Sequence, residues 1–170
     1  MKLVVAVDKN WGIGYKGELL ARVRADLRNF QSITKGHTVV LGSKTLSTFP
    51  GGRTLKDRKN IILSRRPDYQ PENAIVMHSV DEVIRYAENS DEEIFVIGGA
   101  TVYEQLLHCC DTAFVTKFDK SFECDAYFEN LDESLEWYLS DVGEEQTTDP
   151  ETDSEEGMTF RFCTYKRVNK

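Results

Sequence analysis

The chain has 170 residues, of which 40% are apolar, and its formal net charge is -8 at pH 7. This length fits one domain with a sizeable core, and the negative charge argues against nucleic acid or an anionic membrane as a partner. The four cysteines form no C-x-x-C pair and no histidine cluster accompanies them, so we expect no metal site. No stretch has transmembrane length and the N-terminal apolar run is too short for a secretory signal, so we expect a cytoplasmic protein.

The N-terminal segment predicts a buried strand followed by a long loop. Leu3 to Val7 is an apolar run without polar alternation, which is typical of a strand buried on both faces. Asp8 to Gly14 leaves this strand through a loop with two glycines, and no periodicity returns before Leu20. A loop of this length in a compact domain is usually functional or mobile.

The first predicted helix carries an acid on its apolar face. Val23, Leu27, Phe30 and Ile33 share one stripe, and a step of about 100° per residue places Asp26 inside it. One interpretation is a solvated acid in the first turn, where the helix dipole favours negative charge. The other is a half-buried carboxyl group with a raised pKa, able to hold a proton or grip an amidine-like edge. The pattern alone leaves both open.

Three more apolar runs predict buried strands, and each is followed by small or basic residues. The runs are 38–41, followed by Gly42-Ser43-Lys44-Thr45; 60–63, followed by Ser64-Arg65-Arg66; and 94–97, followed by Gly98-Gly99. Helices are expected after the first and third runs, and Thr101 can cap the latter. Glycines without Cβ atoms and the free N–H groups of helix starts suit phosphate. Neither segment has P-loop or G-x-G-x-x-G spacing.

The remaining chain predicts further elements of the same sheet. Residues 74–77 form a short strand, Ser79 to Glu82 is a capping box that opens a helix, and 113–118 is a strand containing Thr116. Residues 135–142 and 160–168 alternate apolar and polar side chains, which predicts an antiparallel hairpin at the edge of the sheet. The acidic connection 143–157 should be a mobile, solvated loop.

These elements predict an α/β fold in a single domain, residues 1–170. We expect a central, mostly parallel twisted sheet of about eight strands flanked by helices, with the C-terminal antiparallel hairpin at its edge. Ligands of open α/β sheets bind at the carboxyl ends of the strands, so a nucleotide-cofactor site is expected there.

The chain resembles the dihydrofolate reductases from end to end. The resemblance rests on Asp26 in the first long helix, the G-x-K-T segment at 42–45, the R-K-N-I-I-L-S run at 58–64 and the V-I-G-G-x-x-V-Y segment at 96–103. It implies NADPH-dependent reduction of 7,8-dihydrofolate to 5,6,7,8-tetrahydrofolate, with hydride transfer to C6 and protonation of N5. It also implies a role in tetrahydrofolate biosynthesis and one-carbon metabolism, inhibition by antifolates, and a monomer.

By the same resemblance, Asp26 accepts hydrogen bonds from the pterin 2-amino group and N3 and helps protonation, and Thr116 fixes its orientation. Arg58 pairs with the α-carboxylate of the substrate's glutamate, which a planar guanidinium can do bidentately. The remaining substrate residues are expected to offer backbone carbonyls or line the pterin and aminobenzoyl slot: Val4, Val5, Leu19, Leu27, Phe30, Leu46, Phe49, Leu55, Ile97 and Tyr103.

The resemblance assigns the cofactor residues to three groups. Ala6 and Ile13 contact the nicotinamide amide, and Ser64 and Arg65, beside Leu63, receive the adenosine 2′-phosphate. The segments after the two glycine-ended strands form the pyrophosphate cradle: Gly42, Ser43, Lys44, Thr45, Gly98, Gly99, Ala100, Thr101 and Val102. The loop 10–20 corresponds to a mobile lid that keeps water from the hydride.

Two departures from the family pattern affect these expectations. Leu19-Leu20-Ala21 and Arg24 stand where the family often has Leu-Pro-Trp and a later proline, so the indole that orders a water beside the acid is absent. Ser43 replaces a frequent arginine, and Arg65, with Arg66, is expected to compensate.

Two other functions remain open from the sequence. One is a related NADPH-dependent reductase of a riboflavin-pathway pyrimidine, which would need neither Asp26 nor Arg58. The other is a folate- or nucleotide-binding module without turnover.

Overall fold

The computed structural model describes residues 1–169 and divides into two compact units. Unit 1 comprises Met1–Leu3 and Thr34–Cys110, and unit 2 comprises Val4–Ile33 and the chain from Asp111 onward. Strand β1 (Lys2–Val7) contributes to both units. The main sheet has the hydrogen-bonded order β10-β11-β7-β1-β6-β3-β4-β5, and β9 also pairs with β11. This arrangement confirms the predicted α/β fold class.

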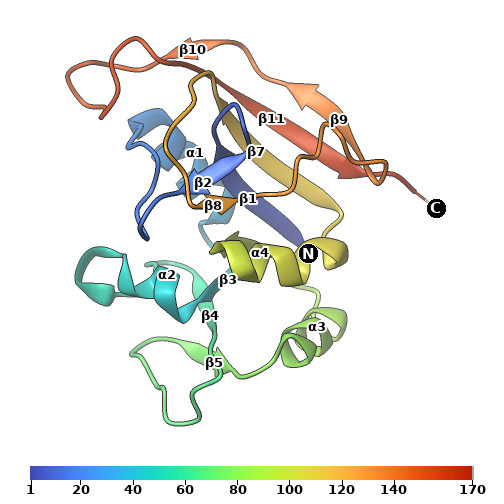
Figure 1. The fold of residues 1–170 in the computed structure, drawn as a ribbon. Coiled ribbons are helices and arrows are strands. Elements are labelled where there is room, and N and C mark those ends of the chain that lie inside the picture. Colours follow the sequence, from blue (N-terminus) through green and yellow to red (C-terminus); the bar gives the residue numbers. More distant parts are fainter. Residues whose placement is uncertain (170) are drawn as a thin grey trace. The chain divides into compact units, whose positions relative to one another are not determined.

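Unit 1 is a parallel sheet covered by short helices. Its strands are β3 (Thr38–Gly42), β4 (Lys59–Leu63), β5 (Ile75–Met77) and β6 (Ile94–Gly98). β3 pairs with β4 and β6, β4 with β5, and β6 with the start of β1, all in parallel. Helices α2 (Ser43–Ser47), α3 (Val80–Glu88) and α4 (Ala100–Leu106) follow β3, β5 and β6 and pack on them (Figure 1). Two short 3-10 helices are Pro50–Gly52 and Leu107–Cys109.

Unit 2 is organised by a long antiparallel strand, β11 (Thr159–Arg167), which pairs with β7 (Thr112–Phe118), β9 (Trp137–Val142) and β10 (Gln146–Thr147). The two-residue strand β8 (Ala126–Tyr127) pairs with β2 (Gly12–Gly14), and the two lie side by side in Figure 1. Helix α1 (Arg24–Thr34) begins at a core cluster of Val23, Phe118, Met158 and Phe160. None of the helices in residues 1–169 has the length and apolar character needed to cross a bilayer.

Several local expectations differ from the structure. Val23 precedes α1 instead of belonging to it, and Leu27 is 48% exposed although it shares the apolar stripe. Thr101 does not cap α4, because Gly99 is the N-cap residue and no side chain bonds there. The capping box of α3 is half formed: Ser79 Oγ accepts from the Glu82 N–H at 3.2 Å, but the Glu82 carboxylate accepts from the backbone of His78. Ser79 and Glu82 are the residue types of a capping box, but the backbone conformation before α3 brings Glu82 to the His78 N–H instead of the Ser79 N–H.

The acidic connection 143–157 is more integrated than its composition predicts. Gln146–Thr147 pairs with β11, and Thr148 is buried. Asp153 and Ser154 accept hydrogen bonds from the backbone N–H groups of Arg24 and Arg22, both at 2.8 Å. The expectation of a solvated loop is therefore wrong for the buried Thr148. It holds for the exposed Ser154, which forms its hydrogen bond at the surface.

Asp8 anchors the loop that leaves β1. Its carboxylate is 2% exposed and accepts hydrogen bonds from the N–H groups of Asn10 and Gly12, both at 2.8 Å, and of Phe122 at 2.9 Å. A Cβ on Gly12 would lie 2.2 Å from Cys124 Sγ, so the loop packs tightly against the segment after β7. One buried carboxylate thus joins two irregular segments.

We predict that Asp8→Ala lowers the free energy of unfolding by about 2–5 kcal/mol, because the buried Gly12 N–H and the part-buried N–H groups of Asn10 and Phe122 lose their acceptor. Urea denaturation followed by circular dichroism measures the change. Asp119→Ala is the matched control, since the Asp119 carboxylate is exposed and has only two long surface contacts, to Lys9 and to the Thr159 hydroxyl, each at 3.4 Å. Equal, small effects of both substitutions would show that Asp8 is not an anchor.

Candidate active site

The half-buried carboxyl group of Asp26 is the chemically distinctive feature of unit 2. Asp26 lies in the first turn of α1, and the buried Thr116 of β7 donates a hydrogen bond from Oγ1 to Asp26 Oδ1 at 2.6 Å. Burial raises the pKa of Asp26 above its ordinary value, and the hydrogen bond from Thr116 offsets part of that rise. The acid can therefore hold a proton at a higher pH than a solvated aspartate, or bind a partner that brings its own protons.

Apolar side chains predicted to line the substrate site lie on the same unit. Val4 and Val5 are buried in β1, while Ala6 is half-buried and packs against the cluster that contains Val23. Phe30 is half-buried on α1, whereas Leu19 is 69% exposed. Unit 2 thus combines the half-buried acid Asp26 with apolar side chains, of which Phe30 is half-buried and Leu19 is exposed.

The loop 10–20 is tied down at its centre. Asp125 Oδ2 accepts from the Lys16 N–H at 3.0 Å, and the Asp125 N–H donates to the Gly14 carbonyl at 3.0 Å. Ile13, predicted to contact a nicotinamide, lies in β2 between these contacts and the Asp8 anchor. Sequence reasoning missed Asp125, because nothing in its local pattern indicates a partner more than a hundred residues away.

In unit 1, the predicted cofactor segments meet at the carboxyl ends of three strands. The register pairs Gly42 of β3 with Leu63 of β4, and Leu41 of β3 with Gly98 of β6. A Cβ on Gly99 would lie 3.0 Å from Thr45 Oγ1, so the two segments approach more closely than ordinary side chains permit. Gly98 has a φ of 129°, which favours glycine, and the Gly98-Gly99 peptide bond is cis.

Both helices at this edge begin without a side-chain cap. Gly42 is the N-cap residue of α2 and Gly99 that of α4, and neither helix start has a side-chain hydrogen bond. Lys44 on α2 is exposed, as is Thr101 on α4, while Val102 is buried. Backbone N–H groups, a hydroxyl and an ammonium group therefore gather where a diphosphate could be held.

The segment after β4 is held by a histidine that the sequence did not single out. The buried Ser64 accepts a hydrogen bond at its backbone carbonyl from His78 Nδ1 at 2.9 Å, in the tautomer that places the proton there. Arg66 stacks on the Tyr69 ring, with 4.3 Å between its Cζ atom and the ring centroid. Arg65, predicted to bind phosphate, is exposed.

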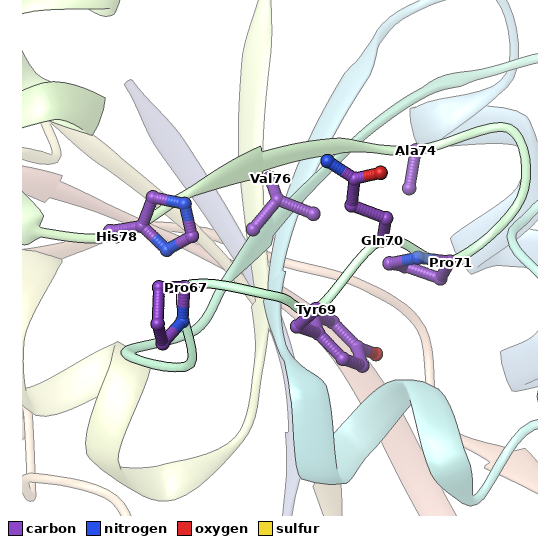
Figure 2. Close-up of a pocket in the computed structure, with 7 residues that line it drawn as sticks. All are labelled: Pro67, Tyr69, Gln70, Pro71, Ala74, Val76 and His78. Atoms are coloured by element: carbon purple, nitrogen blue, oxygen red, sulfur yellow. The ribbon is translucent and has the colours of Figure 1, made fainter.

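A cavity of about 390 Å³ lies beside this segment, between the loop after β4 and strand β5. Figure 2 shows its lining residues, Pro67, Tyr69, Gln70, Pro71, Ala74, Val76 and His78. None of them was predicted as a site residue. His78 lines the cavity and also bonds to Ser64, so the cavity borders the segment predicted to bind the 2′-phosphate.

Arg58 is oriented by contacts within unit 1. Its Nη1 donates to the buried Thr34 Oγ1 at 3.0 Å, and its Nε donates to the Lys56 carbonyl at 2.9 Å. Burial lowers the pKa of the guanidinium from its usual value, and the charge of Asp57 partly offsets this. An arginine retains its charge under such conditions.

Asn60 fixes the backbone on which Arg58 stands. Its buried side chain accepts from the Leu55 N–H at 2.9 Å and donates to the carbonyls of Leu55 and Arg58 at 2.9 and 3.0 Å. Sequence reasoning placed Asn60 only as a strand residue. The feature that could have indicated this structural role is the position of Asn60, a polar amide at the start of an apolar strand. The other substrate residues of unit 1 are Leu46 and Tyr103, which are buried, and Phe49, Leu55 and Ile97, which are half-buried.

The chain matches the family model described as dihydrofolate reductase over residues 1–167. It is 34% identical over 169 residues to the dihydrofolate reductase of Bacillus subtilis (strain 168), covering 99% of this chain and 95% of the relative. It is 30% identical to the dihydrofolate reductase of Heliothis virescens, covering 99% and 97% of the two chains.

A solved structure gives the same result at the level of the fold. The dihydrofolate reductase of Enterococcus faecalis, in complex with NADP(H) and RAB-propyl, is similar with a TM-score of 0.86 and 31% identity. The similarity covers 99% of this chain and 96% of that one. Sequence and structure therefore agree that this chain belongs to the dihydrofolate reductase family.

Proposed function

We propose that this protein reduces 7,8-dihydrofolate to 5,6,7,8-tetrahydrofolate with NADPH. The observation that carries the proposal is the half-buried Asp26, held by Thr116 in a chain that matches the family model over residues 1–167. The Enterococcus faecalis relative was solved with NADP(H), which supports the choice of cofactor. Loss of NADPH absorbance on addition of dihydrofolate is the direct test.

The residues at the strand ends of unit 1 fit a dinucleotide. A diphosphate is bound best where the backbone comes close to it and offers N–H donors. Gly99 lies close to Thr45, with no room for a side chain between them. The helix starts of α2 and α4 have no side-chain cap, so their N–H groups are available as donors. Gly42, Lys44, Thr45, Gly98, Gly99 and Thr101 would hold the pyrophosphate, and Ser64 and Arg65 the 2′-phosphate. When bound, NADPH supplies the hydride that reduces C6.

The substrate would be oriented by charge at both of its ends. Asp26 accepts hydrogen bonds from the pterin 2-amino group and N3, and Thr116 keeps the carboxylate in the orientation that allows this. Arg58 pairs with the α-carboxylate of the glutamate tail, with Thr34 and Asn60 fixing the guanidinium and its backbone. The apolar substrate residues exclude water from the reacting ring.

Asp26 would also promote the protonation of N5. Its raised pKa brings the acid closer to the working pH, where proton exchange is most effective. N5 lies on the other edge of the pterin from the acid, so a water must complete the path. Ala21 offers no indole to order that water, which makes this route particular to the chain.

We propose that the two units act as one catalytic domain, because the family model spans both. We also propose a monomer that works in the cytoplasm. The proposal of a cytoplasmic protein rests on the sequence, whose N-terminal apolar run is too short for a secretory signal. The riboflavin-pathway alternative loses its support, since the family model and the relatives are dihydrofolate reductases.

Asp26→Asn should slow hydride transfer to dihydrofolate severely at neutral pH and much less at acidic pH, where the substrate is already protonated. The amide keeps the shape of the side chain but cannot promote protonation. Single-turnover rates measured across the pH range give the comparison. An equal loss at every pH would refute the proton-related role.

The same substitution should stabilise the fold at neutral pH. A raised carboxyl pKa means that folding favours the neutral form, so the ionised acid costs stability above the folded-state pKa. As the pH falls below the ordinary pKa of 3.8, this cost disappears and the two proteins should converge. Urea titrations at several pH values measure this, and a less stable Asn variant at neutral pH would contradict it.

Arg65→Ala should weaken NADPH binding at least tenfold more than NADH binding, because only NADPH carries the 2′-phosphate. Dissociation constants from fluorescence titration provide the measurement. Arg85→Ala is the matched control, since Arg85 is exposed on α3 and no cofactor contact is predicted for it. If Arg65→Ala weakens both cofactors equally, Arg65 does not read the 2′-phosphate.

A further inference from the structure

The helix that carries Asp26 begins without a capping side chain of its own. Helix α1 starts at Arg24, and the Leu27 N–H donates to the Val23 carbonyl, so Val23 is the N-cap residue. Valine has no side-chain acceptor for the N–H groups of the first turn, which have no partner within the helix. Asp26, the third residue of α1, bonds to Thr116. The N-cap side chain therefore offers no acceptor to the first turn, and its N–H groups are open to an acceptor from another segment or from water.

Asp153 supplies that acceptor from the far end of the sequence. Its Oδ1 accepts from the Arg24 N–H at 2.8 Å, and its Oδ2 accepts from the Asp149 N–H at 2.8 Å. The hydrogen bond to Arg24 is the main reason that the pKa of Asp153 is below its ordinary value, so the acceptor is charged at neutral pH. The same carboxylate thus joins α1 to the turn at Asp149.

Two further hydrogen bonds, both between Ser154 and Arg22, join the same two segments. Ser154 Oγ accepts from the Arg22 N–H at 2.8 Å, and the Ser154 N–H donates to the Arg22 carbonyl at 2.9 Å. The turn itself is closed by the Asp153 N–H donating to the Asp149 carbonyl at 2.9 Å. The segment 149–154 is therefore rigidly connected to the entry of α1, two residues before Asp26.

We propose that Asp153 is a positioning residue for the reaction, which acts by capping α1 and so fixing where the Asp26 carboxylate meets the pterin. The inference rests on the proposed function of Asp26. The charge of Arg24 favours the ionised form of Asp153, and Asp149 bonds to the same carboxylate through its N–H group. From outside the helix, the Lys120 ammonium pairs with Glu155 at 2.5 Å. Thr116 holds the carboxylate of Asp26, and Asp153 holds the backbone of Arg24, two residues earlier on the same helical turn. The two contacts therefore restrain the first turn of α1 at both its start and its acid.

The test compares hydride-transfer rates of Asp153→Ala in two backgrounds, wild type and Asp26→Asn, with saturating NADPH and dihydrofolate. In the wild-type background we expect a loss of about 3- to 30-fold, because small misplacements of a catalytic group slow reactions strongly. In the Asp26→Asn background we expect less than a twofold further loss, because Asp153 acts through Asp26. The KM for NADPH should remain unchanged in both.

Two further variants separate positioning from folding and charge. Glu156→Ala removes one negative charge from the same segment at an exposed residue, and its rate should equal that of the wild type. Asp153→Asn keeps one oxygen, which can still accept from the Arg24 N–H, but loses the acceptor for the Asp149 N–H. Because the cap on α1 is kept, its rate should stay within threefold of the wild type, and it provides a folded variant if Asp153→Ala does not fold. Circular dichroism of each variant tests whether it is folded.

The outcomes are distinct. The same fold loss from Asp153→Ala in both backgrounds would mean a general structural effect and would overturn the inference. So would a rate equal to that of Glu156→Ala, or a tenfold loss in Asp153→Asn. Absence of NADPH oxidation by the wild-type protein would instead refute the proposed function itself.

Discussion

The hydrogen bond between Thr116 and Asp26 is the interaction on which the proposed chemistry of this protein depends. A carboxyl group gains nothing from partial burial by itself, because desolvation disfavours its ionised form. Here one hydroxyl, 2.6 Å away, compensates part of that cost and sets the direction of the carboxylate. A lone acid in this state is suited to an amidine-like edge such as the pterin's, which satisfies the remaining acceptors.

Several irregular segments next to the predicted site are each fixed by one polar side chain. Asp8 holds the loop after β1, Asn60 holds the backbone of Leu55 and Arg58, and Asp153 holds the start of α1. In all three cases the side chain bonds to backbone groups that no helix or strand satisfies. In folds of this kind the functional residues often lie on loops. Here side-chain hydrogen bonds, and not strand pairing, fix the positions of these loop residues.

The sequence predicted the parts whose signal is local. The unalternated apolar runs predicted β3, β4 and β6 almost to the residue. The helical stripe left Asp26 either solvated or half-buried, and the structure shows that it is half-buried. The strands β2, β8 and β10 have two or three residues, too few for a periodicity to show. The contact between Asp153 and Arg24 joins residues 129 positions apart, and an acidic composition alone favoured solvent for it. Roles of individual site residues came from family resemblance, since spacing cannot identify a ligand.

The most direct measurement is a ¹³C NMR titration of the Asp26 carboxyl group in the free protein, in wild type and in Thr116→Val. The account predicts a wild-type pKa above the ordinary 3.8, because burial is the largest influence on the group. It predicts a still higher pKa in Thr116→Val, where the hydrogen bond that favours the ionised form is gone. A wild-type pKa at or below 3.8, or no change on removing the hydroxyl, would contradict it.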